Sequence, residues 1–278
     1  YGMEDLPATL RSEWQASLEA SNKLFRGAML PREEFDSTAM DSKVGFTPSC
    51  LQNWLHCHES AINLLTPEWQ SELSDYDAGA AIADTLDNHQ LEGRHPLDKA
   101  QYVWIKTMLE GQILTWGGDR VDMANSMEAR PAFLDHHLAK FATQVPPQLR
   151  INGSTEKYVL REAMKGLLPK SLYERQKFAF MAPPAHTDPV KWDHVKTLIS
   201  EVADEKSITE AGYLDYSAFK SLLETHEDPS VDSEMKVQHD AIINHVLGVQ
   251  YLHNHFVKQD IPKLAEQKAN ELSWKAGQ

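Results

Sequence analysis

The sequence predicts a mainly α-helical protein, and three observations carry this prediction. Apolar residues recur at three- and four-residue spacing in several segments. Helix starts are marked by a capping side chain followed by proline, at Thr47-Pro48, Thr66-Pro67 and Asp188-Pro189. No segment alternates apolar and polar residues over the length of a strand, and no hairpin signal is present. We therefore expect the chain by itself to be all-α.

Four apolar stripes at helical spacing locate the expected helices: Leu10, Trp14 and Leu18; Leu51, Trp54, Leu55 and Ile62; Ile105, Leu109, Ile113 and Trp116; Leu134, Leu138, Phe141, Ala142 and Val145. The pairs Gly117-Gly118 and Pro146-Pro147 end the last two. A long helix is expected around residues 242–251, and the polar tail from Lys258 is helix-prone. Breaks near 26–48, 92–96 and 181–189 lead us to divide the chain into regions 1–98, 99–189 and 190–278, all parts of one domain.

Composition narrows the function classes. The 278 residues include 27 Lys and Arg against 41 Asp and Glu, a net charge of −14, which argues against binding nucleic acid or an anionic membrane surface. Two cysteines make no disulfide framework and fit a reducing compartment. No apolar run has the roughly 20 residues that a membrane span needs, and no signal-peptide pattern is present. We expect a cytoplasmic protein.

The segment "INGSTEKYVLREAMKGLLP" (151–169) predicts a helix that begins with two cations. Asn152-Gly153-Ser154 has the composition of a turn into an N-cap, with Lys157 in the first helical turn and Arg161 four residues later. Helix N-termini already favour anions, so cations there are unfavourable unless a phosphate is bound. Alternatively, both side chains pair with surface acids such as Glu156 or Glu162.

Charged residues are dense upstream, in "GGDRVDMANSMEARPAFLDHHL" (117–138). The apolar and small residues between them predict substantial burial: Met123, Ala124, Met127, Ala129, Ala132 and Phe133. Buried charges need partners or ligands. Downstream, "YERQKFAF" adds Arg175 and Lys177 before a proline-rich loop. Together the three segments predict a phosphate site built of cations and orienting acids.

These segments resemble the C-terminal half of the synthetase domain in glutamine-dependent asparagine synthetases and related amidotransferases. Four blocks occur in the family's order over about 60 residues: Asp119-Arg120, "SMEARPAFLDH" (126–136), "EKYVLREA" (156–163) and "RQKF" (175–178). Residues 1–98 and 190–278 carry no motif that aligns. The resemblance implies the helical C-terminal portion of an α/β, PP-loop ATP-pyrophosphatase-type domain.

The resemblance also implies a reaction. A carboxylate such as aspartate would attack the α-phosphate of ATP, with Mg²⁺, to form an acyl-adenylate, and ammonia or glutamine-derived nitrogen would then displace AMP. Lys157 matches the family's catalytic lysine. Arg161, Lys177 and Arg120 are candidates for the ATP or pyrophosphate site. Glu128 and Arg130 are either a buried pair on the substrate side or a structural ion pair, and Asp119 is either site or scaffold. Asp135 is expected to cap the following helix.

Three parts of the complete family enzyme are missing from the 278 residues: an "S-G-G-x-D-S" pyrophosphate loop, a "G-E-G-x-D-E" segment and an N-terminal glutaminase cysteine. We therefore expect the chain to be the C-terminal part or a subunit of a larger synthetase. Its partner would be an N-terminal glutaminase and PP-loop portion, in the same polypeptide or another chain, which would also supply most magnesium ligands. The alternatives are a non-catalytic helical assembly or regulatory subunit derived from a synthetase and an unrelated helical interaction module.

Two further histidine-rich stretches do not predict sites. "HCHES" (56–60) lies in an expected helix, where His56 and His58 point apart and no second ligand pair has metal-binding spacing. "HNH" (253–255) lacks the charge and context of a nuclease. We expect no metal site within this chain.

Overall fold

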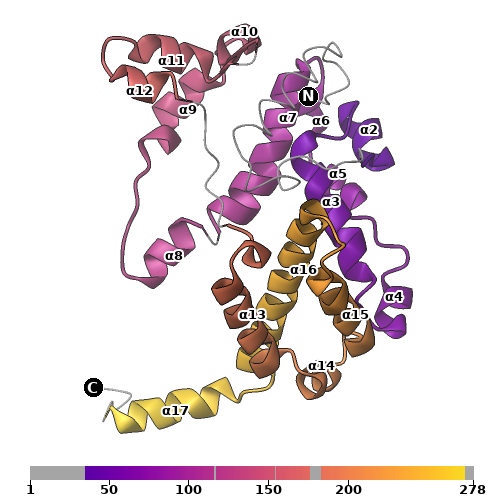
Figure 1. Ribbon diagram of the computed structural model, residues 1–278. Coiled ribbons are helices and arrows are strands. Elements are labelled where there is room, and N and C mark those ends of the chain that lie inside the picture. Colours follow the sequence, from indigo (N-terminus) through magenta and orange to yellow (C-terminus); the bar gives the residue numbers. More distant parts are fainter. Residues whose placement is uncertain (1–34, 116, 154, 176–182, 273–278) are drawn as a thin grey trace. The chain divides into compact units, whose positions relative to one another are not determined.

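The computed structural model describes residues 35–115, 117–153, 155–175 and 183–272, and these are helical almost throughout (Figure 1). The helix expected at Leu10, Trp14 and Leu18 lies outside the described residues. The described chain forms two compact units. One comprises residues 35–52 and 77–175, and the other comprises 53–76 and 183–272. The three-region division drawn from the sequence stays a prediction.

The first unit contains short helices connected by capped turns. Their bounds are α2 Thr38–Val44, the start of α3 Ser49–Ile62, α5 Ala78–Asp84, α6 Asn88–Leu91, α7 Pro96–Trp104, α8 Asp119–Ala124, α9 His136–Ala142, α10 Pro147–Arg150, α11 Tyr158–Met164 and α12 Lys170–Tyr173. A 3₁₀ turn, η3, covers Ala132–Leu134. Helix α2 packs on α5, and Met40, Val44 and Val103 are fully buried in this unit.

The third apolar stripe is helical, but not as a single α-helix. Helix α7 continues into a π-helix, η2, over Ile105–Ile113. Its last bond runs from Leu114 N–H to the Leu109 carbonyl, five residues back, at 2.9 Å. The apolar spacing predicted the helix correctly but could not separate α from π geometry.

A minimal hairpin corrects the all-α prediction. Strand β1 (Ile151–Asn152) pairs antiparallel with β2 (Thr155–Glu156), in the register Ile151 opposite Glu156. Gly153 in the turn has φ +57°, a left-handed conformation that glycine adopts without strain. The turn predicted at Asn152-Gly153-Ser154 is confirmed at Gly153, whereas Asn152 belongs to β1. The two strands, of two residues each, are too short to show alternation in the sequence.

The second unit contains the longer helices and the clearer hydrophobic core. Its elements are the rest of α3, α4 Pro67–Glu72, η4 Ala185–Thr187, α13 Pro189–Val202, α14 Glu205–Ala211, α15 Tyr216–Glu227, α16 Ser233–Leu252, the π-helix η5 His253–Val257 and α17 Ile261–Glu271. Helix α16, the expected long helix, contacts α13, α14 and α15. Ile208, Phe219 and Ile243, one from each of α14, α15 and α16, are almost fully buried in this core.

The capping predictions have mixed outcomes. Asp188 accepts hydrogen bonds from Val190 N–H (3.0 Å) and Lys191 N–H (3.4 Å), which confirms it as the cap of α13. Thr66 precedes α4 but makes no side-chain cap. The Thr47 hydroxyl, predicted to cap α3, instead accepts from Ser37 N–H and donates to Asp41 Oδ1, both at 2.8 Å. It therefore fixes the start of α2.

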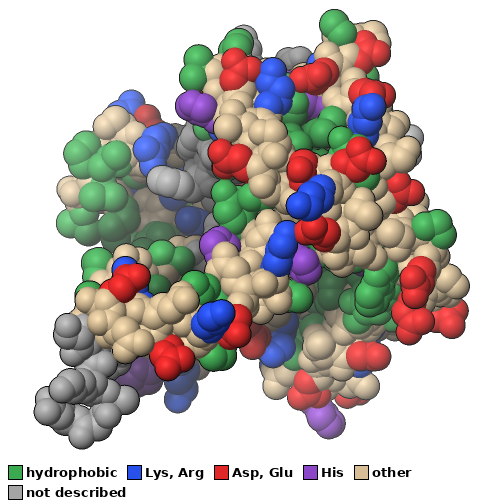
Figure 2. Space-filling model, turned by 90° about the horizontal axis from the view of Figure 1, so that it is seen from below, with side chains coloured by type: hydrophobic (Ala, Val, Ile, Leu, Met, Phe, Trp, Pro, Cys, Tyr) green, Lys and Arg blue, Asp and Glu red, His purple; other side chains and the backbone are tan. Residues whose placement is uncertain are grey.

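Acidic and basic side chains lie close together over much of the face drawn in Figure 2. Pairs such as Lys206–Glu210 and Lys220–Glu224 occur one helical turn apart. Water and salt screen exposed pairs of this kind, so they add little to stability. Within the described ranges, no helix combines the length and apolar character needed to cross a lipid bilayer.

Candidate functional site

The motif-bearing segment carries no core of its own. Between Trp104 and Arg175, none of the described residues is buried. The burial predicted for Met123, Ala124, Met127, Ala129, Ala132 and Phe133 is therefore wrong for this structure, and the Phe133 ring is 70% exposed. The physical reason is that η3 and the short helices α8 and α9 are each too short to cover these side chains. This segment presents its charged motif residues and its apolar residues to the surface together.

Lys157 stands at the junction between the hairpin and helix α11. The sequence predicted Lys157 in the first turn of the helix, but it is the N-cap residue of α11. Its backbone lies in the left-handed region, at φ +55° and ψ +36°. A non-glycine residue costs about 1–2 kcal/mol in this conformation, and such strain concentrates at functional positions. The expected N-cap, Ser154, lies outside the described residues.

The Lys157 side chain is exposed, and within the described ranges no carboxylate pairs with its ammonium. The interpretation that it pairs with Glu156 or Glu162 is not realised here. Glu162 pairs instead with Lys165, at 2.7 Å between Nζ and Oε1. An exposed ammonium at the N-terminal end of a helix is available to an anionic ligand.

Arg161 makes a clamp of three backbone hydrogen bonds. Its Nε donates to the Glu156 carbonyl at 3.1 Å, and its Nη1 donates to the carbonyls of Tyr173 at 2.7 Å and Arg175 at 2.9 Å. It therefore ties the end of β2, immediately before Lys157, to the end of α12. Figure 1 shows α10, α11 and α12 gathered together in this region. The clamp connects the motif block 156–163 to Arg175, the first residue of the fourth block.

Glu128 and Arg130 form an ion pair, but an exposed one. Arg130 Nε and Nη2 donate to the two Glu128 carboxylate oxygens at 2.9 and 3.2 Å, and the two side chains are 83% and 62% exposed. The predicted pairing is confirmed and the predicted burial is wrong. The two residues lie between α8 and η3, and no hydrogen bond or ion pair among described residues connects them to Lys157.

Asp119 and Arg120 lie in the first turn of α8 and are exposed. The Asp135 carboxylate accepts from the N–H groups of His137 and Leu138, at 2.9 and 3.2 Å, which confirms it as the cap of α9. Lys177 lies outside the described residues.

Sequence reasoning missed Ser126, the first residue of the second motif block. Its φ of +57° makes it, with Lys157, one of two left-handed non-glycine residues in the described chain. Both strained residues fall within motif blocks. The sequence signal for Ser126 is weak, because serine is not a typical left-handed residue.

Within the described residues, no three His, Cys, Asp or Glu side chains lie close enough together to share a metal ion. Burial raises the pKa of the Cys50 thiol to about 11 and also raises the pKa of Cys57. Both thiols are therefore protonated at neutral pH and are poor nucleophiles.

Comparison with known proteins places this sequence in a family. The family model described as "Asparagine synthase" matches residues 7–253. Amidase chyE of Penicillium rubens is 35% identical over 151 residues, which are 49% of this chain and 21% of that protein. The glutamine-hydrolyzing asparagine synthetase 1 of Bacillus subtilis is 34% identical over 144 residues, which are 51% of this chain and 21% of that protein.

The chain thus spans about a fifth of the length of these curated relatives. No solved structure matches it. The family match covers most of the chain and includes all four motif blocks around Lys157 and Arg161. The chain belongs to the asparagine synthase family.

Proposed function

We propose that this chain takes part in ATP-dependent amide-bond formation through an acyl-adenylate, as the C-terminal part or a subunit of a larger synthetase. The observation that carries the proposal is the exposed, left-handed Lys157 at the start of α11, within a motif block held by the Arg161 clamp. Family membership supports ligase chemistry and ATP as the nucleotide.

In the proposed reaction, a carboxylate oxygen attacks the α-phosphorus of ATP and pyrophosphate leaves. The nitrogen of ammonia, supplied free or from glutamine, then attacks the acyl carbon, and AMP leaves. Lys157 would stabilise the negative charge that develops on the phosphate oxygens, which is the principal contribution of protein groups to phosphoryl and adenylyl transfer. Aspartate is the acceptor suggested by the asparagine synthetase relatives.

The other candidate residues have secondary roles in this proposal. Arg161 would hold Lys157 in place and complete the anion site, with Lys177 and Arg120 adding positive charge toward pyrophosphate. Glu128, Arg130 and Asp119 would shape the substrate side or serve as scaffold. Magnesium would be held mainly by residues outside this chain. An N-terminal glutaminase and PP-loop portion would supply the pyrophosphate loop that these 278 residues lack.

The alternative is a non-catalytic helical subunit that serves assembly or regulation. ATP–pyrophosphate exchange with candidate carboxylates, measured on the intact assembly that contains this chain, separates the two. An assembly that binds this chain yet exchanges equally well without it would favour the alternative.

Lys157→Gly is the informative variant. Glycine adopts φ +55° without strain, so the substitution removes the ammonium while keeping the backbone conformation. We expect exchange to fall about 100-fold or more, as on loss of a charge-stabilising group. Lys165→Ala is the matched control, since this lysine is exposed on the same segment and pairs with Glu162. Normal exchange by Lys157→Gly would refute the assignment of Lys157.

A further inference from the structure

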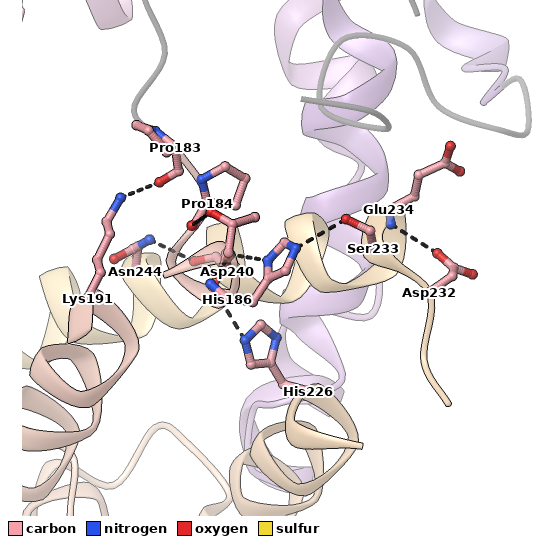
Figure 3. Close-up of polar contacts among 11 residues, drawn as sticks. Pro183, Pro184, His186, Lys191, His226, Asp232, Ser233, Glu234, Asp240 and Asn244 are labelled. Atoms are coloured by element: carbon pink, nitrogen blue, oxygen red, sulfur yellow. Dashed lines mark hydrogen bonds and ion pairs between the residues drawn. The ribbon is translucent and has the colours of Figure 1, made fainter. Parts of the chain in front are cut away.

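The second unit, which does not contain the motif blocks, has a row of polar side chains that the proposed synthetase chemistry does not use. His186 Nε2 lies 3.2 Å from Ser233 Oγ, and His186 Nδ1 lies 2.8 Å from Asp240 Oδ2 (Figure 3). His186 comes from η4, whereas Ser233 and Asp240 lie on α16, two turns apart. A serine, an imidazole and a carboxylate connected in this order form the arrangement that activates a serine hydroxyl.

The Asp240 carboxylate determines which nitrogen of the neutral His186 imidazole carries the proton. The Asp240 side chain is 8% exposed and the His186 side chain 12% exposed, whereas Ser233 is exposed. A buried carboxylate can only accept at His186 Nδ1, so the neutral imidazole carries its proton there. Nε2 then has a free lone pair and accepts from the Ser233 hydroxyl. The carboxylate thus sets the tautomer in which the imidazole can act as a base.

His226 completes the surroundings of Asp240. Its Nε2 lies 3.5 Å from Asp240 Oδ1, and its ring packs on Trp192 with centroids 4.4 Å apart. Burial lowers the pKa of His226 to about 4, although Asp240 partly opposes this effect. His226 is therefore neutral near pH 7 and places no positive charge beside Asp240.

We propose that Ser233, His186 and Asp240 form a nucleophilic serine site that takes an acyl group from small carboxylic esters. Ser233 is the first residue of the 20-residue helix α16. The Asp232 carboxylate already occupies this helix end, where it accepts from Glu234 N–H and Met235 N–H at 3.0 Å each, and activation of Ser233 therefore comes from His186 and Asp240. Exposure of the serine gives small esters direct access. This activity is separate from amide synthesis and does not depend on Lys157.

The reaction balances with water as the only co-reactant. Ser233 Oγ attacks the carbonyl carbon, and its proton passes to His186 Nε2. The bond from that carbon to the alcohol oxygen breaks, and the alcohol leaves with the proton. Water then attacks the acyl-serine and gives a proton to the same nitrogen, which returns it to Ser233 Oγ as the acid departs.

The test is labelling of the purified chain with a fluorophosphonate probe, in which an Oγ–P bond forms and fluoride leaves, followed by peptide mapping. Ser207 is the internal control because it also lies in the first turn of a helix behind an aspartate cap: Asp204 Oδ1 accepts from Ser207 N–H at 2.8 Å. Within the described residues, no imidazole contacts the Ser207 hydroxyl. We expect Ser233 to be labelled at least tenfold faster than Ser207 in the unmodified protein.

Four variants complete the experiment, with folding checked by circular dichroism. His186→Gln and Asp240→Asn should slow labelling of Ser233 about 100-fold, the usual contribution of a general base. Ser233→Ala should also abolish the release of p-nitrophenol from p-nitrophenyl acetate, whereas Ser207→Ala should leave this release unchanged. Equal labelling of Ser233 and Ser207 would overturn the proposal, and that comparison requires no variant to fold. Labelling of Ser233 that is unaffected in a folded His186→Gln protein would overturn it too.

Discussion

Replacement of Arg161 by alanine tests whether the motif blocks are held together by a polar clamp. The substitution removes three hydrogen bonds from the guanidinium to the carbonyls of Glu156, Tyr173 and Arg175. A hydrogen bond contributes about 1 kcal/mol net, and these carbonyls lie in a segment without buried residues, so water can replace part of the loss. We expect local stability to fall by about 2 kcal/mol, which is a roughly 30-fold larger opening constant.

Hydrogen–deuterium exchange, followed by mass spectrometry of peptides that cover residues 155–175, measures this opening. Amides of α11 and α12 should exchange about 30-fold faster in Arg161→Ala, while those of α16 in the other unit should not change. Arg161→Lys should recover only part of the protection, because one ammonium cannot reproduce the planar fork that spans three carbonyls. Lys165→Ala, which removes an exposed pair with Glu162, should change exchange less than threefold. Unchanged protection of residues 155–164 in Arg161→Ala would refute the clamp.

Two further perturbations test the packing of each unit. In the second unit, His226 has a pKa of about 4 when folded against 6.5 unfolded, so the unfolded chain binds more protons between these values. Stability should therefore fall by up to about 3 kcal/mol as the pH drops from 6.5 to 4. Urea unfolding as a function of pH checks this, and a His226→Gln protein with the same pH slope would contradict it. In the first unit, a Cβ added at Gly79 would lie 2.1 Å from Ser37 Oγ, the cap of α2. Gly79→Ala should lower the free energy of unfolding by about 2–3 kcal/mol through overpacking and loss of the cap. Gly111→Ala should not destabilise the protein, because the added Cβ meets no atom within 4 Å. Equal melting temperatures of the two variants would contradict this reasoning.

The sequence was sufficient for the features that depend on local chemistry. Caps such as Asp135 and Asp188, and the long helix around residues 242–251, follow from side-chain type and apolar spacing, and the structure confirms them. The four motif blocks also predicted the family correctly, since residue order and spacing are themselves the signal.

The tertiary contacts of the candidate sites could not be predicted, because they join residues that are distant in sequence. The carbonyls that the Arg161 guanidinium contacts lie up to 14 residues away and carry no residue-type signal, so the sequence does not predict these hydrogen bonds. His186 and Asp240 are 54 residues apart, so no local pattern predicts their contact. The left-handed backbone of Lys157 and Ser126 was also unpredictable, because neither residue type favours that conformation.

The motif segment combines precise local geometry with a lack of burial, and this combination bears on how the site works. Its shape is held by polar contacts, namely the Arg161 clamp, the Glu128–Arg130 pair and the Asp135 cap, each of which water can weaken. Apolar side chains such as Phe133, Phe141 and Leu167 remain exposed beside them. Exposed apolar groups of this size gain roughly 1.5–3 kcal/mol each when covered. Packing of the proposed PP-loop portion against this segment would therefore supply the stability that the polar contacts lack, and would exclude water from around Lys157. Its ammonium would then act on phosphate in a medium of lower dielectric, where its effect on the reaction is largest.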